Sequence, residues 1–123
     1  MTGVSAGGIA TFLWTNYVRD LVSNPSNVLM IPDSGIFMIA KTYQTGTDFL
    51  LTTVVNMFKL ANIDEKTPLA LCNGRYKDEE YKCLFIEYAW TSFQSRTLLV
   101  NSEYDSWVIA NTLKLSCLKN GTT

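Results

Sequence analysis

The chain has 123 residues, a net charge of −1 and hydrophobic residues at 47% of its positions. This composition suits one globular unit with a core and excludes a disordered tail or a coiled coil. The basic residues are scattered without a cluster, which argues against a nucleic-acid-binding face. No apolar run reaches the ~18 residues that a membrane span needs.

Near its start the chain has Gly3-Val4-Ser5-Ala6-Gly7-Gly8, which contains the pattern G-x-S-x-G. In serine hydrolases of the α/β class this pattern forms a sharp turn from a strand into a helix, and we expect a side chain at either flanking glycine to clash there. The turn exposes the serine hydroxyl and aims the N–H of Ala6 at the oxygen of the attacked carbonyl. The same residues also fit a glycine-rich turn that caps a helix.

Apolar residues at helical spacing predict an amphipathic helix directly after this serine: Ile9, Phe12, Leu13, Tyr17 and Leu21. The turn residues at positions 23–27 end it. Before the serine, only Met1 and Thr2 are available for the strand that such a turn requires.

Two short apolar runs predict strands of a parallel sheet. Residues 28–31 form an unbroken run, typical of a strand that is covered on both faces, and Pro32 breaks it. Residues 97–101 form the second buried-strand candidate. Functional loops lie at the carboxyl ends of such strands, so we expect residues 33–37 on the same rim as Ser5.

Between these runs we expect further helical and irregular segments. Thr47 or Asp48 fits the N-cap of a helix that turns five apolar side chains inward, namely Phe49, Leu50, Val54, Met57 and Phe58. Residues 62–80 are polar and predicted to be irregular. Residues 81–93 predict a helix or turn over the sheet, and a last helix runs through Ile109 and Leu113.

The residue types limit the chemistry of the chain. There is no histidine, so a Ser-His-Asp triad cannot be completed within these residues, and histidine-containing zinc sites are excluded. Three cysteines are too few for an all-cysteine zinc site, and we expect neither a metal nor a cofactor. Cys72 and Cys83 fit a local disulfide in an oxidising compartment or free thiols in a reducing one.

Asp105 stands just beyond the second strand candidate, where α/β hydrolases keep the acid of their triad. It also fits the N-cap of the helix that follows. Its neighbours Tyr104 and Trp107 fit aromatic residues of a core or of a cleft wall.

Four sequence blocks together resemble the pectin acetylesterase and Notum-like carboxylesterase family. They are Gly3-Val4-Ser5-Ala6-Gly7-Gly8, Asp33-Ser34-Gly35-Ile36-Phe37, the pair Cys72 and Cys83, and Leu99-Val100-Asn101-Ser102-Glu103-Tyr104-Asp105-Ser106-Trp107. The resemblance implies an α/β, α/β-hydrolase-like fold: a partial parallel sheet flanked by helices. Residues 1–123 would be the central part of one domain, without its N-terminal strands and oxyanion loop and without its C-terminal histidine segment.

The resemblance also implies roles for single residues. Ser5 matches the family nucleophile and Asp105 the triad acid, with the Ala6 N–H in the oxyanion hole. The rim of the cleft would include Asp33, Phe37, Tyr104 and Trp107, although Asp33 fits equally a role in capping its own loop. Val4 departs from the plant members, which usually carry a cysteine there, and Pro32 precedes the Asp33 block.

The function implied is hydrolysis of O-acyl, acetyl-type esters on a polysaccharide or another acylated substrate by a serine carboxylesterase, outside the cell or in the secretory pathway. Because the triad histidine is absent, we expect this chain by itself to be an incomplete and inactive part of such an enzyme. The alternative is a non-catalytic pseudoenzyme or binding module that keeps an α/β-hydrolase-like cleft. Neither nucleic acid nor a membrane span is expected.

Overall fold

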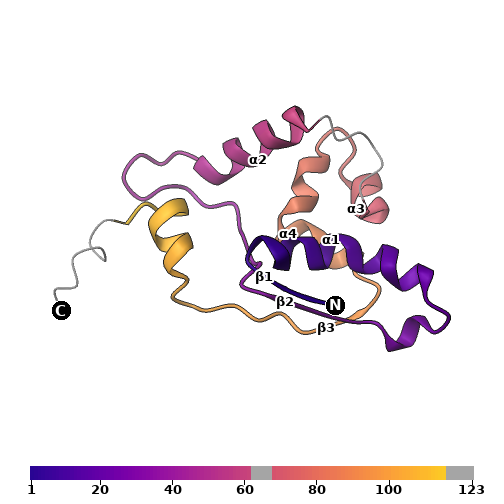
Figure 1. Ribbon diagram of the computed structural model, residues 1–123. Helices are drawn as coiled ribbons and strands as arrows, with labels where there is room; N and C mark the ends of the chain where they lie inside the picture. The colour runs from indigo at the N-terminus through magenta and orange to yellow at the C-terminus, as the bar shows by residue number, and fades with distance from the viewer. Residues whose placement is uncertain (62–67, 116–123) are drawn as a thin grey trace.

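A three-stranded parallel sheet with helices around it organises the chain, as the computed structural model shows (Figure 1). The structure describes residues 1–61 and 68–115. The strands lie in the order β1-β2-β3, and the long helix α1 packs on β1 and β2. The prediction of an α/β fold with a partial parallel sheet flanked by helices is confirmed. Among the described residues, no helix is long and apolar enough to cross a membrane.

Strand β1 (Thr2–Val4) supplies the strand before Ser5 with only three residues. It forms because it pairs in parallel along its whole length with β2 (Leu29–Asp33), so that Val4 lies opposite Asp33. The pairing extends to the first residue, where the carbonyl of Met1 accepts a hydrogen bond of 2.9 Å from the Ile31 N–H.

Helix α1 (Ala6–Leu21) confirms the predicted amphipathic helix: of its predicted apolar residues, Phe12 lies in the core and Ile9 and Leu13 pack against it, whereas the last two are exposed. Tyr17 and Leu21 are 52% and 68% exposed. The buried residues of the helix are mostly small or polar, and they are Gly8, Thr11, Phe12, Thr15 and Asn16. Small side chains let the helix approach the sheet closely, and hydropathy does not mark such residues as core.

Strand β2 runs through Pro32, so the prediction that this proline ends the strand is wrong. A proline in a strand only removes one N–H donor from the hydrogen bonds between neighbouring strands. On the side toward β3, the carbonyls of Met30 and Pro32 accept hydrogen bonds from the N–H groups of Leu98 and Val100. The missing N–H of Pro32 belongs to the same side, because N–H and C=O of one residue point to the same neighbour in a strand. Pro32 therefore weakens the pairing with β3 and leaves the pairing with β1 intact.

Strand β3 is accordingly short, Arg96–Thr97, with one further bridge between Val100 and Asp33. The prediction of a buried strand over residues 97–101 is wrong both in the length of the strand and in its burial. The strand ends at Thr97, and Leu98, Leu99 and Val100 after it are each more than 40% exposed. On β2, Leu29 is also 45% exposed while Met30 and Pro32 are buried, so the sheet is well covered on one face only.

Short helices make up most of the remainder. They are η1 (Pro25–Asn27), α2 (Phe49–Leu60), α3 (Ala70–Arg75), η2 (Glu80–Leu84), α4 (Ile86–Ala89), η3 (Trp90–Ser92) and the π-helical turn η4 (Val108–Thr112). Asp48 precedes α2 as predicted, but its side chain makes no capping hydrogen bond, and only Leu50 of the five expected residues is buried. Helix α3 lies in the stretch predicted to be irregular. Residues 62–67 of that stretch lie outside the described residues.

The core joins the sheet to α3, η2 and α4. Its buried apolar members are Phe12, Met30, Leu69, Cys72, Cys83, Ile86 and Ala89. Cys72 of α3 and Cys83 of η2 form a disulfide inside this cluster. At the surface of the loop that the disulfide closes, Lys82 donates a hydrogen bond to Glu79, and this bond lowers the pKa of the Glu79 carboxyl.

Candidate functional site

Ser5 lies at the turn between β1 and α1, with backbone angles φ 58° and ψ −121°. A non-glycine residue with positive φ is uncommon and strained, and such residues cluster at functional sites. The strain is built into the tight reversal from strand to helix. An ideal Cβ on Gly3 would stand 2.2 Å from the carbonyl oxygen of Gly7, so only glycine fits at position 3. This is the geometry in which a serine hydroxyl projects beyond the end of a strand.

The second glycine of the pattern behaves differently from the expectation. A Cβ on Gly7 would meet no atom within 4 Å, so the prediction that a side chain would clash there is wrong. The crowded position is Gly8, whose Cβ would lie 2.8 Å from the Asp33 carbonyl oxygen and 2.9 Å from the Cα of Gly35. Helix α1 therefore touches the loop after β2 through backbone atoms at Gly8.

The N-terminus of α1 starts at Ser5. The Ser5 carbonyl accepts the N–H groups of Gly8 and Ile9 at 2.8 and 3.2 Å. The first N–H groups of a helix have no partner inside it and form the positive end of its dipole. Ala6 is the first residue of α1, so its N–H is one of these groups at the positive end of the helix.

Asp33, at the carboxyl end of β2, contacts the serine turn through its main chain. Its carbonyl accepts a hydrogen bond of 2.9 Å from the Ser5 N–H, and its carboxylate accepts one of 2.8 Å from the Ser34 hydroxyl. Ser34 has a φ of 51°, and its own N–H donates to the Val100 carbonyl at 2.8 Å. Hydrogen bonds therefore join Ser5, Asp33 and Val100 directly at the carboxyl ends of the three strands.

Asp105 follows this edge after a turn at residues 103–104. Its Oδ1 accepts hydrogen bonds from the N–H groups of Trp107 and Val108, at 2.9 and 3.0 Å, and so caps the helical turn that leads into η4. The capping role that the sequence left open is thus present. Asp105 also lines a cavity of about 300 Å³ whose other walls are mainly apolar residues of segments 36–40 and 108–113.

The aromatic residues expected at the rim lie partly together. The rings of Phe37 and Trp107 meet edge to face with their centroids 5.3 Å apart, which connects the loop after β2 to the segment that carries Asp105. Tyr104 is 79% exposed. Asn101, which the sequence analysis did not single out, accepts a hydrogen bond from the Ile36 N–H at 3.3 Å and also lines the cavity beside Asp105. Ser5 does not line that cavity.

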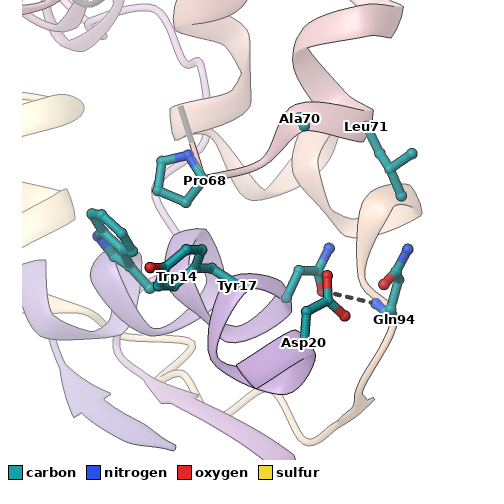
Figure 2. Close-up of a pocket in the computed structure, with 8 residues that line it drawn as sticks. Trp14, Tyr17, Asp20, Pro68, Ala70, Leu71 and Gln94 are labelled. Carbon is teal, nitrogen blue, oxygen red and sulfur yellow. Dashed lines mark hydrogen bonds between the residues drawn. The ribbon is translucent and has the colours of Figure 1, made fainter. Parts of the chain in front are cut away.

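A second cavity, of about 360 Å³, lies along the other half of α1 (Figure 2). Trp14, Tyr17 and Asp20 of α1 face Leu71 of α3 and Gln94 across it. The Gln94 N–H donates to the Asn16 side chain at 3.1 Å, and Arg19 pairs with Asp20 at 3.1 Å. This cavity is separated from Ser5 by more than two turns of the helix, and among the described residues no serine, cysteine or lysine lines it. Among the described residues there is no cluster of three side chains that could hold a metal ion.

The fold and the site define an α/β protein whose candidate nucleophile is a serine at a strained strand-to-helix turn. The family model described as Pectinacetylesterase matches residues 1–123, and the chain belongs to this family. Among curated proteins of Arabidopsis thaliana, "Pectin acetylesterase 7" is 26% identical over 121 residues, which are 98% of this chain and 30% of that protein. "Pectin acetylesterase 5" is 28% identical over 113 residues, which are 92% of this chain and 26% of that protein. The chain thus spans less than a third of the relatives that it matches.

Proposed function

We propose that this chain carries the nucleophile and the acid of a serine carboxylesterase that hydrolyses O-acyl, acetyl-type esters of a polysaccharide. The observation that carries the proposal is the conformation of Ser5, which combines positive φ, the end of a parallel strand and the start of a 16-residue helix. Membership of the pectin acetylesterase family supports the ester and the polysaccharide as substrate class.

In this mechanism the Ser5 oxygen attacks the acyl carbon, and its proton passes to a histidine. The alcohol of the sugar leaves with that proton, and water then releases the acyl group from Ser5 in the reverse sequence. The Ala6 N–H stabilises the oxyanion, and Asp105 orients the histidine. The chain contains no histidine, so in this mechanism the histidine is supplied by residues other than these 123, and the family resemblance implies the same for the second oxyanion donor. The disulfide between Cys72 and Cys83 supports an oxidising compartment, outside the cell or in the secretory pathway.

The absence of histidine favours one alternative, a non-catalytic binding module that keeps the serine turn. A direct assay separates the two functions. The assay would compare the chain alone with a chimera in which residues 1–123 replace the matching segment of Arabidopsis pectin acetylesterase 7. Its readout would be hydrolysis of p-nitrophenyl acetate. The chain alone should not exceed the buffer rate, because nothing deprotonates Ser5 near neutral pH.

The chimera should hydrolyse p-nitrophenyl acetate, and Ser5→Ala should return its hydrolysis to the buffer rate. Ser26→Ala, at an exposed turn residue, is the matched control and should retain full activity. Efficient hydrolysis by the chain alone, or a Ser5→Ala chimera that remains active, would refute the mechanism. A chimera that is folded by circular dichroism but inactive favours the binding module.

A further inference from the structure

The contact between Gly8 and Gly35 joins two sequence blocks that lie far apart in the chain. An ideal Cβ on Gly35 would stand 2.8 Å from both the Cα and the carbonyl carbon of Gly8, and 3.0 Å from the Ile9 nitrogen. The atoms on both sides belong to the backbone, so a side chain at either position can be accommodated only if helix and loop move apart. Gly35 is buried, and no positive φ accompanies it, so the contact alone requires glycine there.

The same place holds Ser5. The Ser5 N–H donates to the Asp33 carbonyl at 2.9 Å, two residues before Gly35, and Ser5 stands three residues before Gly8. The loop is itself fixed to the next strand, because the Ser34 N–H donates to the Val100 carbonyl at 2.8 Å. The strained turn is thus held between the sheet on one side and this loop on the other.

We infer that Gly8 and Gly35 are positioning residues for the nucleophile: their backbone contact seats the first turn of α1 on the loop after β2 and so fixes Ser5 in its strained conformation. This inference rests on the proposed function of Ser5. It also assigns the loop 33–35 a role that its sequence did not indicate. Asp33 acts through its carbonyl on the serine turn, while its carboxylate is held by Ser34.

The chain offers a matched set of variants to test this role. Gly35→Ala and Gly8→Ala add one methyl group at the contact, whereas Gly7→Ala adds the same group one residue away, in open space. In the chimera, Gly35→Ala and Gly8→Ala should each lower kcat about 100-fold with KM changed less than about twofold, because a displacement of the order of 1 Å at a reacting group costs a factor of this size. Gly7→Ala should leave both constants unchanged.

A second readout does not depend on catalysis. Exchange of the Ser5 amide proton, measured by NMR in the same four proteins, should be at least about tenfold faster in Gly8→Ala and Gly35→Ala than in the parent and in Gly7→Ala. If the parent chimera has no esterase activity, the proposed function fails, and the exchange rates alone decide this inference. Equal exchange in all four proteins overturns it. Loss of the whole fold in both contact variants also overturns it, because the contact would then serve the fold rather than Ser5.

Discussion

At Asp105 one carboxylate has an observed capping role and a proposed catalytic role, and different substitutions can separate the two. Its Oδ1 caps the turn before η4, and the proposed mechanism requires its negative charge beside a histidine. Asparagine caps helices about as well as aspartate but carries no charge.

We therefore expect Asp105→Asn to leave the thermal midpoint of the chimera nearly unchanged and to lower kcat by roughly 10⁴-fold, as the loss of the triad acid does elsewhere. Asp105→Ala removes the cap as well and should cost about 1 kcal/mol of stability in addition. Calorimetry and the esterase assay on both variants check this expectation. If Asp105→Asn retains full activity, the carboxylate only caps the helix.

The position of Ser5 between a strand and a helix could be predicted because the motif and the helical spacing after it are local. Which glycine is crowded could not, because the answer depends on a loop almost thirty residues away. Gly7 and Gly8 are adjacent glycines, and only the packing of Gly8 against Asp33 and Gly35 distinguishes them. The capping of Asp105 was anticipated as one of two roles, since a carboxylate before a helix has a local partner in the first N–H groups of that helix.

At the scale of elements, the disulfide is the strongest link between α3 and η2. The two cysteines are 11 residues apart and both are buried in the core cluster. Replacing both by alanine should lower the free energy of unfolding by about 3 kcal/mol, the loop-closure value for a ring of this size. Urea unfolding of the chain measures the difference, and Cys117→Ser, which leaves the bond intact, is the control. No change in the urea midpoint of the double variant would contradict a stabilising role.

The elements themselves were predicted better than their ends and faces. Strand β2 and helices α1 and α2 follow from apolar runs and spacing. Pro32 was misjudged because its effect depends on which neighbour its missing N–H faces, and that neighbour is the weakly paired β3. Helix α3 was missed because a six-residue helix carries little periodicity and is held by Cys72 and the core rather than by its own pattern.

At the scale of the whole molecule, β1 and β3 are the outer strands among the described residues, and each has one unpaired edge. Apolar residues on and beside the strands are exposed, among them Val4, Leu29 and Leu98. Parallel sheets are normally covered on both faces. Since the chain matches less than a third of each relative, we propose that further segments of a pectin acetylesterase domain cover these surfaces. The exposed face of the sheet could not be predicted from the composition, because the same apolar residues are present whether that face is covered or exposed.

We propose that Ser5 becomes a nucleophile once the rest of a pectin acetylesterase domain surrounds it. The most direct measurement is peptide mass mapping of the chimera after reaction with diisopropyl fluorophosphate, in which the Ser5 oxygen bonds to phosphorus and fluoride leaves. We expect an adduct on Ser5 of the chimera, none on Ser5 of the chain alone, and none at any of residues 1–123 in the Ser5→Ala chimera. An adduct on a different serine of residues 1–123, with Ser5 unmodified in an active chimera, would contradict this proposal.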